Sequence, residues 1–223
     1  MADFLYRHDD LGKCFAQHLS FIGNNILPQQ IELLWKDIAV RYTEPQRAYH
    51  TLDHIEQLMM QLENIKPSLS EPNTIALALY YHDIVYDPTR SDNEQKSAEY
   101  AVEALSPYLN STRCQDIYAL IIMTADHQID ALIDEDNRND AAYLLDMDLS
   151  VLGAPWSTYQ QYTQAVRQEY VHVTDVDYRH GRTAILQGLL AHPRLYLTDY
   201  YYERLEAQAR DNIEREIILL AAL

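Results

Sequence analysis

The chain has few of the residues that interrupt or cross-link a fold: five of its 223 residues are glycine and two are cysteine. No proline- or serine-rich linker and no low-complexity tract separates one part from another, which predicts a single domain over residues 1–223. The two cysteines, Cys14 and Cys114, lie far apart and lack the spacing of a metal site. They are therefore expected to be free thiols in a reducing cytoplasm.

Long apolar segments and an excess of positive charge are also missing. No apolar run approaches the roughly 20 residues of a membrane span, and residues 1–10 lack the pattern of a secretory signal, so neither is expected. Lys and Arg number 17 against 34 Asp and Glu, a formal net charge of −17. This excess of negative charge argues against nonspecific binding to duplex nucleic acid, which requires a cationic face. A small phosphorylated substrate remains compatible, because a bound metal reverses the local field.

What the chain does contain is apolar residues at helical spacing along almost its whole length. These spacings of three and four, with few alternating strand patterns, predict an all-α bundle of roughly nine or ten helices. Segment 73–86 is apolar almost all round, which is typical of a central buried helix. The expected helices span residues 11–22, 29–42, 46–65, 73–86, 92–108, 112–127, 140–152, 156–174, 178–191 and 199–221.

Metal-type side chains occur in three separate segments of this pattern. His54 comes first, His82 and Asp83 are adjacent on the central expected helix, and an acidic pair, Asp146 and Asp148, follows. Two neutral imidazoles and two carboxylates suit a hard or borderline divalent ion. Three or four protein ligands also leave coordination positions for water and substrate. A carboxylate such as that of Asp83 in an apolar helix needs an ion or a cation as partner.

The spacing within two of these segments predicts which side chains share a helix face. His50 and His54 are four residues apart, so we expect them one turn apart on the same face, one for the metal and the other for the substrate. His82 and Asp83 would point about 100° apart, and both reach one ion only if it lies at the edge of the helix.

The order H…HD…D on an all-α chain resembles the HD superfamily of metal-dependent phosphohydrolases. From about residue 30 to the end, the chain is similar to a bacterial group of predicted HD phosphohydrolases of about this length. The resemblance implies one HD-domain-like bundle, with a metal-site core over about residues 46–153 and C-terminal helices 156–221 packing on it. The matching stretches are 47–50, 54–55, 81–86, 92–94, 97–98, 146–149, 152–153, 167–170, 181–182, 206, 209–210 and 212.

The resemblance also implies roles for individual residues. His54, His82 and Asp83 would be metal ligands, with Asp83 taking part in catalysis as well. The ion would be divalent, and Mn, Mg, Co, Zn, Ni and Fe stay open. Tyr49-His50 with His54 resembles the Tyr-His…His segment of cyclic-nucleotide phosphodiesterases, in which the first histidine protonates the leaving oxygen. His50 is therefore expected to be the general acid, a role that histidine suits near neutral pH.

The fourth ligand has to be chosen from the acidic pair. Asp146 and Asp148 would lie about 200° apart around a helix, so only one of them can bind the same ion. Asp148-Leu149-Ser150 resembles the Asp-Leu-Ser that supplies a ligand in the phosphodiesterases, and it occupies the Asp of the Ala-Asp-Arg-Leu segment of ppGpp hydrolases. We therefore favour Asp148 and keep Asp146 as the alternative.

Four further residues are candidates for binding the substrate. Arg47, one turn before His50 on the expected helix, is placed to hold a phosphate bidentately. His127 ends an expected helix, where a cation that caps the helix is the alternative interpretation. Asn93 and Glu94 open helix 92–108, and Ser91–Glu94 also matches a capping box, which is their structural alternative.

These residues and the resemblance together imply a cytoplasmic, bacterial, metal-dependent phosphohydrolase that cleaves a phosphoester of a small phosphorylated metabolite with a metal-activated water. Nucleotides are among the candidate substrates. Two alternatives stay open: a metal-stabilised nucleotide-sensing module without catalysis, and an HD-type di-iron oxygenase, which would need further histidine ligands such as His127. No membrane partner is expected, and a homodimer is suggested only by analogy with other helical hydrolases.

Overall fold

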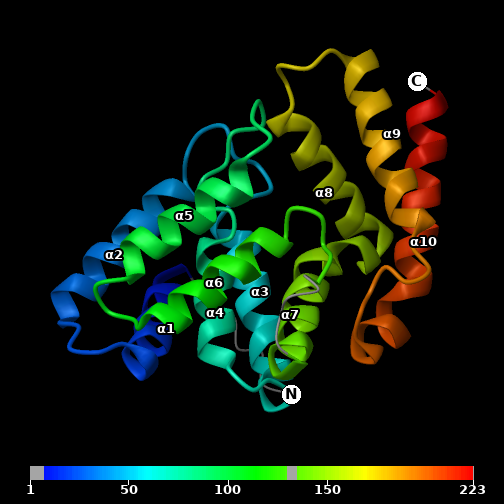
Figure 1. The fold of residues 1–223 in the computed structure, drawn as a ribbon. Helices are drawn as coiled ribbons and strands as arrows, with labels where there is room; N and C mark the ends of the chain where they lie inside the picture. The colour runs from blue at the N-terminus through cyan, green and yellow to red at the C-terminus, as the bar shows by residue number, and fades with distance from the viewer. Residues whose placement is uncertain (1–7, 130–134, 223) are drawn as a thin grey trace. The chain divides into compact units, whose positions relative to one another are not determined.

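The computed structural model describes residues 8–129 and 135–222 (Figure 1). Across these residues it contains ten α-helices, two 3₁₀ helices and no strand, which confirms the all-α prediction. No helix in these two ranges combines the length and the apolar composition needed to cross a membrane. The chain divides into two compact units, Met1–Leu144 and Leu145–Leu223, with the boundary inside α7 (Glu135–Asp148). The single domain inferred from the sequence stays a prediction.

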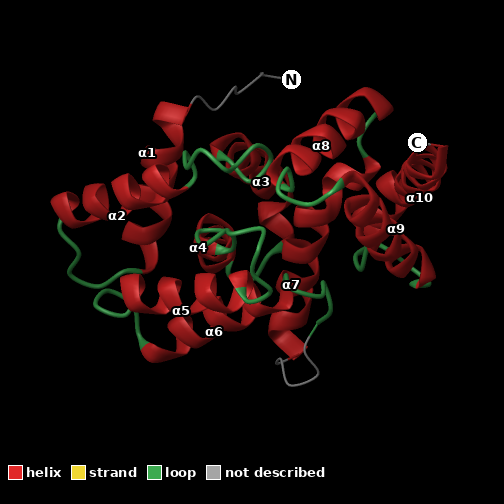
Figure 2. Ribbon diagram, turned by 90° about the horizontal axis from the view of Figure 1, so that it is seen from above, coloured by secondary structure: helices red, strands yellow, loops and turns green. Residues whose placement is uncertain are grey.

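The first unit is built around one short helix. Every residue of α4 from Thr74 to Tyr81 is buried, and α4 contacts α1, α3, α5 and α6. Figure 2 shows α4 end-on with these helices around it. An apolar helix needs neighbours on all sides, so the prediction of a central buried helix is confirmed. The unit consists of α1 (His8–Ile22), α2 (Pro28–Arg41), α3 (Leu52–Ile65), η1 (Lys66–Ser68), α4 (Pro72–Tyr81), α5 (Asn93–Leu105), α6 (Ser111–Met123) and most of α7.

Two helices of this unit are shorter than the periodicity predicts. Helix α3 begins at Leu52, because Thr51 is extended (φ −119°, ψ −179°) and residues 46–50 form turns and bends. Helix α4 ends at Tyr81, with His82 as its C-cap and Asp83 in the turn that follows. Both ends are therefore loop segments, and these segments carry candidate site residues.

The start of α5 also differs from its prediction. The helix begins at Asn93 with Asp92 as N-cap, so the capping box expected from Ser91 is wrong. The carboxylate of Asp92 instead pairs with the guanidinium of Arg90, at 2.6 and 2.8 Å.

The second unit contains η2 (Leu149–Gly153), α8 (Trp156–Glu169), α9 (Asp175–Ala191) and α10 (Asp199–Ala222). Helices α9 and α10 lie side by side (Figure 1), and α10 also packs on η2. The amide of Asn212 donates to the Leu152 and Ala154 carbonyls, both at 2.8 Å, which fixes η2 on α10. Gly153 allows this approach, because a Cβ there would lie 2.6 Å from the Cβ of Leu205.

Candidate metal centre

Two buried histidines of the first unit face each other nitrogen to nitrogen. His54 lies in the first turn of α3 and His82 caps α4, and their Nε2 atoms are 3.3 Å apart. His82 Nδ1 lies 2.8 Å from the carbonyl oxygen of Leu79. A carbonyl can only accept, so Nδ1 carries the proton and Nε2 of the neutral ring presents a lone pair. A backbone carbonyl that holds the far ring nitrogen in this way is typical of histidines that bind metals.

A carboxylate adjoins this pair. Oδ2 of Asp83 lies 3.0 Å from Nε2 of His82 and 3.9 Å from Nε2 of His50. The Asp83 side chain is 14 % exposed and the His82 side chain 1 %, so the group stands at the edge of the buried interior. Imidazole nitrogens with a carboxylate oxygen form a donor set that fits a borderline divalent ion.

His50 lies next to this group, but not for the reason inferred from the sequence. The prediction that it shares a helix face with His54 is wrong, because His50 lies in the bends before α3. Its ring is 6.1 Å from that of His54 and stacks on Tyr86 at 4.1 Å between centroids. The side chain is 20 % exposed, so it is the part of the group open to a substrate.

Arg47 holds the backbone of this group in place. Its guanidinium donates to the carbonyls of His50 at 3.1 Å, Asp83 at 2.8 Å and Ile84 at 3.0 Å. It also donates to the Glu44 carboxylate at 3.2 Å, and the Arg47 side chain is 0 % exposed. Arg47 was expected on a helix, one turn before His50, and this prediction is wrong because residue 47 precedes α3 and is not helical. Binding a phosphate through Arg47 would require these hydrogen bonds to be given up.

The acidic pair belongs to the second unit, in which hydrogen bonds hold the carboxylate of Asp146. Asp146 is 1 % exposed, and its carboxylate accepts from the Leu197 amide at 2.7 Å and from the Thr198 amide and hydroxyl at 2.8 and 2.6 Å. Burial raises the pKa of Asp146, and these hydrogen bonds oppose the rise. Asp148, the last residue of α7, is partly buried. Binding an ion through Asp146 would require these hydrogen bonds to be given up.

The remaining substrate candidates lie at the start of α5 and in the turn after α6. The side-chain oxygen of Asn93 accepts from the backbone N–H of Asp87 at 3.1 Å, and its side-chain nitrogen donates to the Asp87 carbonyl at 2.9 Å. Asn93 therefore closes the turn before α5. Glu94 lies in the first turn of α5 and is partly buried. His127 follows α6 in a left-handed conformation (φ 54°), with its amide bonded to the Met123 carbonyl. Their substrate roles stay predictions.

Two contributors to the site were not singled out from the sequence. The Leu79 carbonyl orients His82, and no sequence signal marks a single backbone carbonyl. The ring of Tyr86 stacks on His50, and the available signal was its place at the end of the matching stretch 81–86.

Comparison with known proteins assigns no family: no family model and no curated protein matches the chain. The function therefore has to follow from the chemistry of the residues themselves.

Proposed function

We propose that this chain is a metal-dependent phosphohydrolase acting on a small phosphorylated metabolite, with nucleotides among the candidates. One observation carries the proposal: two buried imidazoles meet Nε2 to Nε2 at 3.3 Å, beside the Asp83 carboxylate. Two neutral nitrogens at this distance need a proton or an ion between them, since two lone pairs repel. A divalent ion fits this donor set, and both imidazoles would then bind it through their lone pairs.

We propose His54, His82, Asp83 and Asp148 as the ligands. Asp148 is preferred over Asp146 because the Asp146 carboxylate already accepts three hydrogen bonds within the second unit. The resemblance of Asp148-Leu149-Ser150 to ligand segments of phosphodiesterases supports the same choice.

The ion would supply an activated water and neutralise charge on the phosphoryl oxygens. His50 would deliver a proton to the leaving oxygen, because its ring is partly exposed and held between Tyr86 and the Asp83 carboxylate. Asp83 would bind the ion beside His82, and its carboxylate lies 3.9 Å from Nε2 of His50. Arg47 would keep the loop of His50 and the turn of Asp83 together through their carbonyls. A cytoplasmic location and a homodimer belong to the same proposal.

Metal analysis of the purified protein, followed by a phosphate-release screen, tests this function. The screen would cover nucleotides and sugar phosphates with Mn, Mg, Co, Zn and Fe added back. We expect bound metal and turnover that disappear together in His82→Ala and persist in His180→Ala, an exposed histidine of α9. Metal without turnover on any phosphoester would favour a sensor or an oxygenase. Absence of metal from the wild-type protein would refute the ligand assignment.

A further inference from the structure

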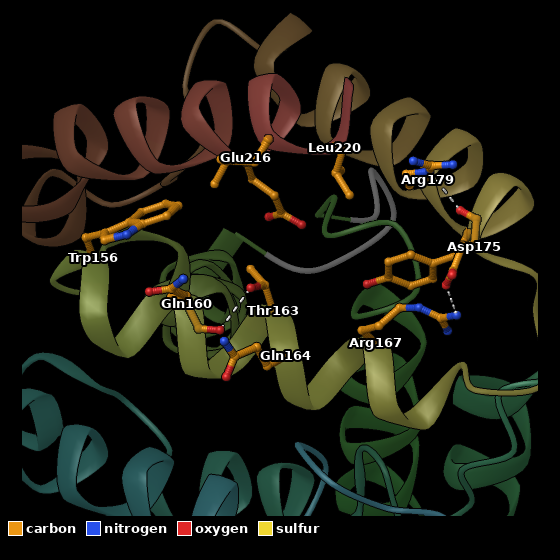
Figure 3. Close-up of a pocket in the computed structure, with 11 residues that line it drawn as sticks. Trp156, Gln160, Thr163, Gln164, Arg167, Asp175, Arg179, Glu216 and Leu220 are labelled. Carbon is orange, nitrogen blue, oxygen red and sulfur yellow. Dashed lines mark hydrogen bonds and ion pairs between the residues drawn. The ribbon is translucent and has the colours of Figure 1, made fainter. Parts of the chain in front are cut away.

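The second unit contains a pocket whose lining includes none of the predicted site residues. It opens between α8, α9 and α10 and has a volume of about 620 Å³, within the roughly 300–1,000 Å³ typical of small-molecule sites. Figure 3 shows Trp156 at one end and Arg179 at the other, with Gln160 on α8 and Leu220 on α10 between them. The pocket therefore has an apolar end, a charged end and polar groups along one wall.

The charge at the base of the pocket is already compensated. Glu216 accepts from Arg182 at 2.8 and 3.2 Å and from the Tyr159 hydroxyl. The Arg182 and Glu216 side chains are only 8 % and 7 % exposed. Breaking such a buried pair is costly, so this base is rigid. Glu216 consequently presents no uncompensated negative charge to a ligand.

The two arginines at the charged end, Arg167 and Arg179, differ in how many of their guanidinium nitrogens already bind protein groups. Arg167 donates to the Tyr170 and Val173 carbonyls and pairs with Asp175 at 2.6 Å. Arg179 uses only Nε, which donates to the Asp175 carbonyl at 3.1 Å. Its terminal nitrogens make no hydrogen bond to any residue that the structure describes. Arg179 is therefore the cation available to a ligand.

Tyr178, next to Arg179, supplies a second donor. The residue is 9 % exposed, and its hydroxyl makes no hydrogen bond within the described ranges. Because the hydroxyl still has solvent access and Tyr178 lines the pocket, it opens into the pocket. Burial raises the pKa of Tyr178 to about 12, so the hydroxyl stays a donor. The hydroxyl can therefore donate to an acceptor that enters the pocket.

We propose that this pocket binds a small organic anion with an apolar or aromatic body. The anionic group, a carboxylate, phosphate or sulfonate, accepts from Tyr178 and from the terminal nitrogens of Arg179. The body packs on Trp156, Leu219 and Leu220. This site is additional to the proposed hydrolase centre and does not depend on it.

The balance of charge supports an anionic ligand. Three arginines, Arg167, Arg179 and Arg182, line or underlie the pocket against two carboxylates, Asp175 and Glu216. The whole chain has the opposite ratio, with 17 basic and 34 acidic residues. The pocket is therefore a locally cationic region of an acidic protein.

Two fluorescent probes that differ only in charge test the proposal. Anilinonaphthalene sulfonate carries an aromatic body and an anion, and phenylnaphthylamine has the same rings without the sulfonate. We expect Arg179→Gln to weaken binding of the sulfonate about tenfold, as for loss of one charge-assisted contact, and to leave the neutral probe unchanged. Tyr178→Phe should weaken the sulfonate severalfold, and Leu220→Trp, which fills the pocket, should reduce binding of both probes.

Arg204→Gln is the matched control, because Arg204 is an exposed arginine of the same unit outside the pocket. It should bind both probes like the wild-type protein. Thermal unfolding of each variant checks that the fold is kept. Arg179→Gln removes one hydrogen bond of the folded protein, from Nε to the Asp175 carbonyl, so we expect it to perturb the fold little. Equal sulfonate affinity in the wild type and in Arg179→Gln would overturn the anion site. Unchanged binding of both probes in a folded Leu220→Trp protein would show that they do not bind in this pocket and would also overturn it.

Discussion

Each unit buries a cluster of ionisable side chains, and the two clusters use their polar atoms differently. In the second unit, Arg182, Glu216 and Tyr159 satisfy one another, so the cluster serves the fold. In the first unit, the nitrogens of His54 and His82 point at each other beside a carboxylate. Burial of ionisable groups is common to both units, and only the arrangement in the first unit presents a donor set that suits an ion. The direction in which buried atoms point is thus more informative than burial itself.

The largest expected effect concerns His50. His50→Ala should retain bound metal and lower the phosphohydrolase rate by about 10²–10⁴-fold, the usual contribution of a general acid. Metal content and steady-state rates on the substrate found in the screen measure the two quantities. Loss of metal from this variant would show that His50 is a ligand and that our division of roles between His50 and His54 is wrong.

A change in the buried ion pair of the second unit should lower stability and leave metal binding unchanged. Arg182→Met leaves Glu216 buried without its cation and should lower the free energy of unfolding by about 3–5 kcal/mol. Metal content should not change in the fraction that remains folded. Urea unfolding measures the loss. The double variant Arg182→Met with Glu216→Leu removes both charges and should recover part of the stability, and failure to recover would argue against an uncompensated charge as the cause.

The acidic pair offers the same comparison within one helix. Asp146→Asn should cost about 1–3 kcal/mol, because an amide cannot accept from both the Leu197 and Thr198 amides, while metal is kept. Asp148→Asn should lose metal affinity, because an amide lacks the negative charge of a carboxylate ligand. Metal analysis and urea unfolding of both proteins distinguish the two roles. Full metal retention in Asp148→Asn would reject Asp148 as the ligand.

The smallest effect concerns a buried histidine that serves the core. His18 contacts the Asn73 amide oxygen at 2.8 Å, and burial lowers its pKa. The unfolded chain then binds a proton that the folded chain refuses, so stability falls as the pH drops below the ordinary histidine value of about 6.5. His18→Gln should make the loss of stability between about pH 7 and pH 5 smaller. His180→Gln is the exposed control, and an equal slope in wild type and His18→Gln would contradict the prediction.

Helix content followed from the sequence, but the helix ends that carry the site did not. The spacing of apolar residues continues through segment 46–51, yet Thr51 is extended and α3 begins only at Leu52. The Arg47 guanidinium bonds to carbonyls of residues 36 and 37 positions away, which favours a loop at this point. Periodicity within one segment contains no information about such distant partners.

The candidate residues were predictable by type, whereas their engagement was not. His54, His82 and Asp83 were chosen as metal-type side chains, and the structure places His82 beside both others. Arg47 and Asn93 were chosen as substrate ligands, and their donors are engaged by the protein itself. A guanidinium or an amide has the same formula in both roles, so only its neighbours distinguish them.

The sequence by itself determined the all-α class, the central apolar helix and the side chains able to bind an ion. These features depend on local periodicity and on the chemistry of single residues. The tertiary structure decided which imidazole nitrogens face each other, which backbone amides hold Asp146, and that three helices enclose a locally cationic pocket near Arg179. Each of these depends on contacts between segments far apart in the chain, which fix the direction of a side chain only when the fold is complete.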